Sequence, residues 1–323
     1  IPGQNKFRQM GTAFKTPNAY RTASGAPGQL YWQHQANYKI SIELDDVNQK
    51  ITGEETIEYI NNSPDVLSYL WVQLDQNMRQ KESLTLAITP LQARHMRYGF
   101  YKNMFHGEFD GGFKIGSVTD GQGNPLPHTI NYTMMRIDLP QALEPGQKTQ
   151  LAISWWYNIN DRMKMRGRSG MEYFKEDDNY VYTIAQFFPR MAVYSEVEGW
   201  QNNQFLGQTE FALPFGNYEV DITVPADHVV GATGVLVNAE EVLSSKHLQR
   251  LEAAKKSLED PVIIVSQEEA IEAEKTKSTD KKTWKYKAEN VRDFGFASSR
   301  KFIWDGMGVK FGDRTVLATS LYP

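Results

Sequence analysis

The chain has 323 residues, of which 40% are hydrophobic, 12% aromatic and 23% charged, a composition typical of a folded globular protein rather than a disordered one. Its formal charge of −4, from 35 Lys plus Arg against 39 Asp plus Glu, is too small to favour a nucleic-acid partner. The absence of cysteine excludes disulfides and thiolate metal sites, and no apolar run approaches the roughly 18 residues of a membrane span.

Residues 1–28 are rich in Gly, Pro, Asn, Thr and Gln and lack periodic apolar positions, so we expect an extended N-terminal arm without a core of its own. The folded body is expected over residues 29–323. The chain begins IPGQNKFRQM, without an initiator Met or an apolar leader, and resembles the start of a mature exported protein. This start predicts a periplasmic or secreted location.

Apolar residues alternate with polar ones along most of the body, in short runs separated by turn-forming segments such as NNSPD, DGQGNPLP and EPGQK. The alternation predicts strands at 38–44, 51–61, 67–74, 84–88, 130–139, 151–157, 180–187, 218–224, 229–236 and 284–288. The first two, joined by DDVNQK, predict a hairpin. Short strands linked by polar turns predict a mainly β protein with antiparallel sheets.

A helical insertion at about 240–280 is predicted within this β pattern. Asn238, with Glu241 three residues later, has the spacing of a capping box, and Pro261 would end the first helix. Ser266 and Glu269 offer a second cap of the same kind. Because strand alternation resumes at residue 284, the helices form an insertion and do not begin a helical domain.

Two segments carry a resemblance to a known family: FALPFGNYEVDITVPADHVVGATGVLVN at 211–238 and VRDFGFASSRKFIWDG at 291–306. From residue 30 onward the chain resembles the N-terminal saddle-shaped β domain of the aminopeptidase N family, whose relatives include the leukotriene hydrolases. The resemblance implies a large antiparallel multi-sheet, saddle-like β-sandwich. In the family, a catalytic domain that binds zinc follows this β domain.

The catalytic domain of that family carries a His-Glu-x-x-His helix, in which two histidines hold zinc and the glutamate acts as base. This sequence contains no such motif. The resemblance therefore implies a non-catalytic domain that shapes the substrate cleft and docks on its own catalytic domain, where the zinc is expected. The complete protein would remove N-terminal residues from peptides with a free amino terminus, whereas this chain alone is predicted to be inactive, without catalytic residues or bound metal.

Two residues are candidate contacts for the substrate's α-ammonium group. Glu172, in SGMEYF, resembles the glutamate of the family's Gly-x-Met-Glu motif, but in the family that motif lies in the catalytic domain. The alternative is an ordinary loop glutamate. Gln186, in YTIAQFFPRM, resembles a Gln or Glu that family β domains extend into the cleft; alternatively, it satisfies backbone groups at a strand end.

Other motifs favour structural roles. The six histidines show no pair at helical spacing, which predicts no metal site: His34, His95, His106, His128, His228 and His247. Ser298-x-x-Lys301 matches a nucleophile pattern but lacks its companion motifs. Trp155-Trp156-Tyr157 has rings that could stack on sugars, although strand aromatics are more often core or interface residues. A rival function is a stand-alone β-sandwich module that binds glycans or protein partners.

Overall fold

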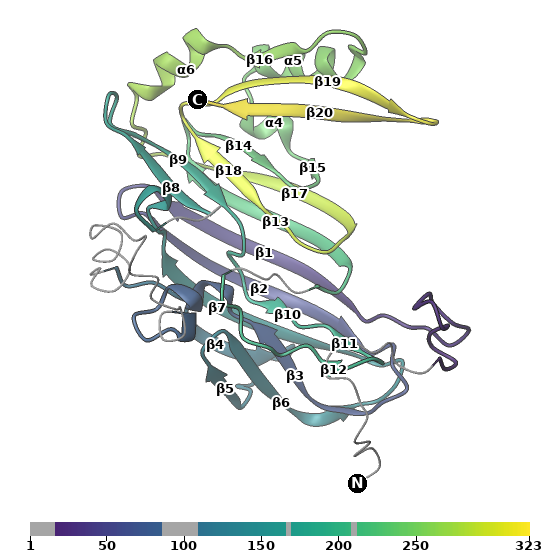
Figure 1. Ribbon diagram of the computed structural model, residues 1–323. Coiled ribbons are helices and arrows are strands. Elements are labelled where there is room, and N and C mark those ends of the chain that lie inside the picture. Colours follow the sequence, from purple (N-terminus) through teal and green to yellow (C-terminus); the bar gives the residue numbers. More distant parts are fainter. Residues whose placement is uncertain (1–16, 86–108, 166–168, 208–211) are drawn as a thin grey trace, which may run out of the picture.

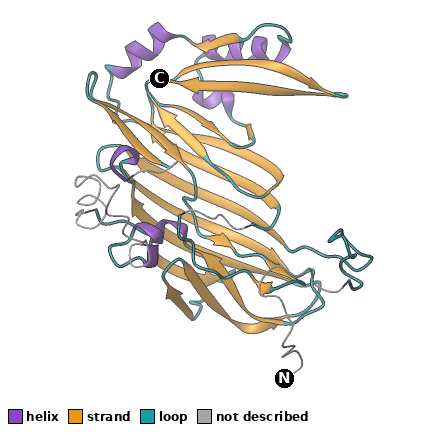
Figure 2. Cartoon of the chain, in the orientation of Figure 1, coloured by secondary structure: helices purple, strands orange, loops and turns teal. Residues whose placement is uncertain are grey.

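The computed structural model describes residues 17–85, 109–165, 169–207 and 212–323. Strands are the main secondary structure of these residues, and the longer helices gather at one end of the molecule (Figure 2). The sheets are antiparallel except where β1 and β13 run parallel in the largest sheet. The predicted fold class, mainly β with several antiparallel sheets and a short helical excursion, is confirmed.

The largest sheet has seven strands and runs through the middle of the molecule (Figure 1). In sheet order they are β15 (Val235–Leu236), β17 (Lys281–Val291), β13 (Gly216–Pro225), β1 (Gln35–Asp45), β2 (Lys50–Ile60), β7 (Lys148–Asn158) and β4 (Lys114–Asp120). The predicted β1–β2 hairpin is present, with Ile42 opposite Gly53 and Asp45 opposite Lys50. Alternate side chains along these strands are buried, as a sheet with one covered face requires.

Two four-stranded sheets pack on the covered face of the seven-stranded sheet, which we call its inner face. One consists of β10 (Arg190–Met191), β3 (Leu67–Gln73), β6 (Met134–Leu143) and β5 (His128–Asn131). Another consists of β14 (Val229–Ala232), β18 (Phe296–Ser299), β9 (Asn179–Ile184) and β8 (Gly170–Phe174). Short elements complete the body: β11 (Tyr194–Ser195), β12 (Gly199–Trp200), the 3-10 helix η1 (Asp75–Arg79) and α3 (Arg162–Met165).

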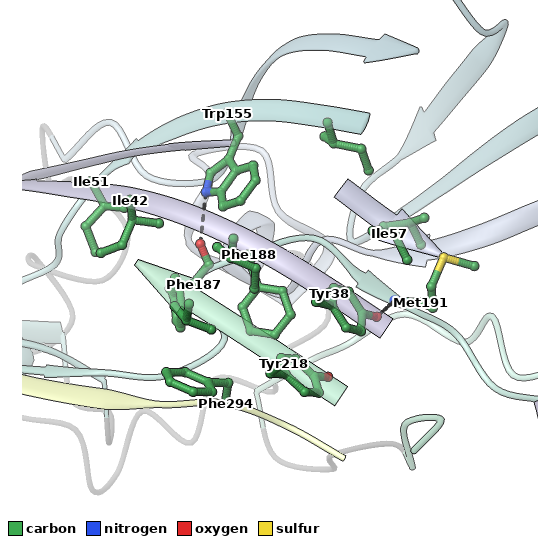
Figure 3. Packing of buried hydrophobic residues seen from close by; sticks show 14 of the residues in the cluster. Tyr38, Ile42, Ile51, Ile57, Trp155, Phe187, Phe188, Met191, Tyr218 and Phe294 are labelled. Atoms are coloured by element: carbon green, nitrogen blue, oxygen red, sulfur yellow. Dashed lines mark hydrogen bonds between the residues drawn. The ribbon is translucent and has the colours of Figure 1, made fainter. Parts of the chain in front are cut away.

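Aromatic side chains from the seven-stranded sheet and from residues 187–191 meet in one buried core (Figure 3). Two hydrogen bonds tie this segment to the sheet. The Trp155 indole Nε1 donates to the Phe187 carbonyl at 2.9 Å, and the Met191 backbone N–H donates to the Tyr38 hydroxyl at 2.9 Å. The core therefore fixes the position of the chain just after residue 186.

The predicted helical insertion contains α4 (Ala239–Val242), α5 (Ser245–Lys256), β16 (Val262–Val265) and α6 (Gln267–Glu274). Its strand β16 pairs with β19 (Ile303–Phe311), which pairs with β20 (Arg314–Tyr322). We call these six elements the C-terminal module. They lie together at the top of Figure 1 and have a small core of their own: Leu251, Ala254, Ile264, Val265 and Trp304.

The helix caps agree only partly with prediction. Asn238 does not cap α4: its side chain instead donates to the Thr283 carbonyl and accepts from the Lys285 N–H, both at 2.9 Å, which anchors the insertion to β17. The first predicted helix is divided because Ser244 caps a new start at α5. The capping box predicted at Ser266 is confirmed at the start of α6.

Three strand predictions need correction. Residues 130–139 form the hairpin β5–β6, which turns at Tyr132, a residue with φ of 51°. Residues 229–236 are divided into β14 and β15 at Gly234, where φ is 90° and a Cβ would lie 2.2 Å from the Lys287 carbonyl oxygen. The strand predicted at 84–88 begins in helical conformation at Leu84 and Thr85, and its other residues lie outside the described part.

Candidate functional site

Gln186 lies two residues beyond the end of β9 and has an unusual backbone conformation. Its φ of 54° falls in the left-handed region, which costs a non-glycine residue on the order of 1–3 kcal/mol and persists where surrounding contacts hold it. Gln76 of η1 supplies such contacts, because its side-chain Nε2 donates to the Gln186 carbonyl at 2.9 Å and to the Ala185 carbonyl at 3.3 Å. The hydrogen bonds from Gln76 therefore hold the bend in the chain at Gln186 in one conformation.

Arg190 anchors the segment that follows. Its guanidinium bonds to Asp75 at 2.8 and 3.1 Å and to Asp293 at 2.6 Å, and its side chain is 5% exposed. Burial opposes the charge, but the two carboxylates outweigh burial, and the pKa of Arg190 is raised. The charge is therefore permanent, and it ties residues 187–191 to η1 and to the loop before β18.

The start of β8 lies beside the end of β9. The Ser169 hydroxyl accepts a hydrogen bond from the Ala185 N–H at 3.0 Å and donates one to the Ala185 carbonyl at 3.1 Å. The Asn160 side chain donates to the Ser169 carbonyl at 3.0 Å. Gly170 has φ of 140°, and a Cβ there would lie 2.3 Å from the Asn160 carbonyl oxygen. The glycine of the Gly-Met-Glu segment is therefore required by its positive φ and by its close approach to Asn160.

Glu172 lies farther along β8, opposite Val181, which is five residues before Gln186 in the chain. Its carboxylate is bound by Arg162 of α3, at 2.6 Å from Nη2 and 3.0 Å from Nε. The two side chains are 24% and 35% exposed, so this is a partly solvated ion pair. The structure brings Gly170 to the Gln186 segment but leaves Glu172 in a separate contact.

Sequence reasoning did not identify the polar residues that hold this site, namely Gln76, Ser169 and Arg190. Arg190 gave a usable signal, because an arginine inside the apolar run FFPRMA predicts a buried charge that needs carboxylate partners. Gln76 and Ser169 gave no such signal in the sequence, because each bonds to backbone carbonyls of residues more than ten positions away.

The Ser298-x-x-Lys301 pattern serves structure. The Ser298 hydroxyl lies 2.9 Å from His228 Nδ1, and His228 Nε2 lies 3.9 Å from Asp46. The order resembles a hydrolytic triad, yet Ser298 is fully buried and His228 is 3% exposed, so no substrate reaches the hydroxyl. Lys301 forms ion pairs with Asp177 and, at 3.0 Å, with Glu274.

Within the described residues, no three His, Asp or Glu side chains lie close enough together to hold a metal ion. His95 and His106 lie outside the described part. The same ranges contain no helix both long enough and apolar enough to cross a membrane.

No family model and no curated protein matches the sequence. Among solved structures, the chain is similar to an M1 zinc metallopeptidase from Deinococcus radiodurans, with 12% identity, a TM-score of 0.48, and 90% of this chain covering 47% of that one. A mutant of that peptidase bound to a Tyr-Ser-Ala substrate has the same identity and TM-score and is covered over 48%. A two-domain M1 zinc metallopeptidase mutant bound to L-tryptophan has 11% identity and a TM-score of 0.47, with 92% of this chain covering 50% of that one. The chain thus spans about half the length of these structures.

Proposed function

We propose that this chain is the N-terminal β domain of a zinc-dependent aminopeptidase, which shapes the substrate cleft and docks on the catalytic domain. The sequence resemblance of residues 211–238 and 291–306 supports the proposal, as does a mainly β fold. The observation that carries it is Gln186, a polar residue held in a left-handed conformation by Gln76 where a strand ends. Strained backbone of this kind gathers at ligand sites.

In this proposal the side chain of Gln186, a residue that is 9% exposed, helps to bind the α-ammonium group of a peptide. An amide oxygen accepts a hydrogen bond from an ammonium group without neutralising it, and such a bond is worth about 1.5–3 kcal/mol. Arg190 and Gln76 act on Gln186 by holding the chain on either side of it. The contribution is to binding and orientation of the substrate, and no bond is made or broken by this chain.

Zinc belongs to the catalytic domain in this proposal, because neither the sequence nor the described residues offer a fitting ligand set. Bound zinc would polarise the scissile carbonyl and activate water. The residues of this chain would hold the substrate amine in place and form one wall of the cleft.

Glu172 enters the proposal as a second contact to the substrate amine. Its carboxylate is already paired with Arg162, so an incoming ammonium group would have to compete with a guanidinium. The expected contribution of Glu172 is therefore smaller than that of Gln186. A periplasmic or secreted location is part of the same proposal.

The test uses a polypeptide that joins this chain to the catalytic domain. It should release N-terminal residues from short peptides and leave N-acetylated peptides intact. Gln186→Ala should raise KM by about ten- to a hundred-fold, the equivalent of one hydrogen bond to a charged group, with a smaller effect on kcat. Glu172→Gln is the matched comparison and should change KM less. An unchanged KM in Gln186→Ala would remove the role of Gln186, and absence of any peptidase activity would remove the function.

A further inference from the structure

The outer face of the seven-stranded sheet, opposite the core, is hollowed across its central strands. Two adjoining hollows of about 410 and 420 Å³ share Ser41, Glu54 and Ser154 in their walls. We call the two together the outer groove. Each hollow is within the size range of small-ligand sites. The segment that carries Gln186 packs on the inner face instead.

Strand register places a polar row along this groove. Asp221 of β13 is opposite Ser41 of β1, Ser41 is opposite Glu54 of β2, and Glu54 is opposite Ser154 of β7. Ser154 in turn lies 2.8 Å from the Ser117 hydroxyl of β4. Neither Glu54 nor Asp221 forms an ion pair within the described ranges. The row therefore presents free carboxylates and hydroxyl groups side by side.

Trp156 supplies an apolar wall at one end. Its neighbours Trp155 and Tyr157 are 2% exposed and point into the core, so strand alternation directs Trp156 outward. Lys50 Nζ lies 4.2 Å from the Trp156 ring centroid, but Lys50 does not line the groove, whereas Trp156 does. Gly116 keeps the neighbouring space open, since a Cβ there would lie 2.8 Å from the Ser154 hydroxyl oxygen.

The position of the groove decides how a ligand can be recognised. Strands β13, β1, β2 and β7 each have a neighbour on both sides, so their backbone N–H and C=O groups are paired within the sheet. A peptide cannot add to them as an extra strand. Any ligand must be bound through the side chains alone, by polar groups and one indole ring.

We propose that the outer groove binds a neutral oligosaccharide. Sugar hydroxyls donate to carboxylates such as Glu54 and Asp221 and exchange hydrogen bonds with serine hydroxyls. The apolar C–H face of a pyranose ring packs on an indole such as Trp156. Lys39 is the one cation among the residues that line the 410 Å³ hollow, but Glu219 is paired with Lys287, and Lys285 of β17 is opposite Asp221. Glu54 is the carboxylate without such a neighbour, and its charge disfavours acidic glycans.

The experiment measures binding of neutral trisaccharides of glucose, mannose, xylose and N-acetylglucosamine to the whole 323-residue chain. Intrinsic fluorescence and chemical-shift changes report binding. At least one trisaccharide should bind with a Kd of about 1 mM or tighter. Trp156→Ala should weaken that binding at least about tenfold, and so should Glu54→Gln. Glutamine has nearly the same shape as glutamate, and Glu54 is exposed, so this substitution should leave the fold intact.

Matched controls lie far from the groove. Phe311→Ala removes an aromatic ring that is 68% exposed on the C-terminal module, and Glu144→Gln removes an exposed carboxylate from a turn. Both variants should bind the trisaccharide as the unaltered chain does. The proposal is overturned if no trisaccharide binds, if peptides bind at Trp156 in their place, or if Trp156→Ala and Glu54→Gln, both folded by thermal melting, bind normally. Aminopeptidase activity of the longer polypeptide is independent of all these outcomes, because Gln186 is on the other face.

Discussion

The body buries large aromatic side chains in one continuous core shared by three sheets, whereas the C-terminal module buries a small cluster around Trp304. The module contacts the body through apolar residues, such as Val242 of α4 in the main core and Val229 of β14 against the small core, and through polar contacts. Lys301 binds Glu274 at 3.0 Å, and Asp227 accepts hydrogen bonds from Thr276 and Ser278 at 2.7 Å. Apolar burial scales with core size, so the body should unfold as one cooperative unit and the module should open more easily.

Two tryptophan substitutions test this difference most strongly. Trp155→Ala removes a core ring that is 2% exposed and donates a hydrogen bond to Phe187, and we expect the free energy of unfolding to fall by about 3–5 kcal/mol. Trp304→Ala should lower the free energy of global unfolding less, while accelerating amide exchange in α5 and β16. Urea denaturation and hydrogen exchange measure the two effects. Equal losses with uniform exchange would show that body and module form a single unit.

Arg300→Met tests the polar network of the body that holds Asp227, the residue that accepts from Thr276 and Ser278 next to the module. Arg300 is 3% exposed and binds Asp227 twice at 3.1 Å and Asp46 at 2.9 Å. Removing one partner from a buried charge network leaves unpaired carboxylates, and we expect a loss of about 3 kcal/mol in urea denaturation. Lys310→Met, an exposed lysine of β19, is the control and should change stability little. A similar small change in both variants would mean that this polar network contributes little to stability.

The body and the C-terminal module also differ in how much of their secondary structure could be predicted from the sequence. Body strands such as β1, β2, β7 and β13 were predicted because alternation is a local signal and one face of each is buried. In the module, β16 was missed: its sequence VIIV has no alternation and lies between two helices. Pairing with β19, some forty residues later in the chain, makes it a strand, and a local pattern does not contain that information.

The candidate site shows the same limit. The position of Gln186 near a strand end was predictable from YTIAQFFPRM, since β9 ends at Ile184. Its left-handed backbone was not, because it depends on bonds from Gln76, which lies 110 positions away. Glu172 was recognisable as part of a motif, but its ion pair with Arg162 is visible only in three dimensions.

Acid should weaken the body through His228, which contacts Ser298 of β18 and Asp46. Burial, with help from the nearby Arg300, lowers the pKa of His228 to about 3 from an ordinary value of 6.5. The unfolded chain then binds a proton that the folded chain excludes, so this group's contribution to stability is complete above pH 6.5 and is lost as pH falls towards 3. Urea denaturation should therefore show lower stability at pH 4 than at pH 7 because of this group.

His228→Gln should remove that part of the pH dependence, because glutamine does not titrate and its amide can still bond to Ser298. The exposed His128→Gln variant should keep the pH dependence of the unaltered chain. If His228→Gln and His128→Gln have the same stability profile between pH 4 and pH 7, His228 does not control acid sensitivity.

A substitution of Glu55 in the body has the smallest expected effect, and the pH dependence of this group has the opposite sign to that of His228. It lies on β2, opposite Ile40 of β1 on one side and Ile153 of β7 on the other, and is 3% exposed. Within the described residues, neither of its carboxylate oxygens has a hydrogen-bond partner. Burial raises the pKa of Glu55 well above 4.5, so its folded form holds a proton longer than its unfolded form does. Stability from this group is therefore complete below pH 4.5 and is lost as pH rises through the folded pKa. Glu55→Met should stabilise the chain by about 1–3 kcal/mol at pH 7 and by less at pH 4, and a destabilised variant at pH 7 would mean that the carboxylate has a favourable role in the core.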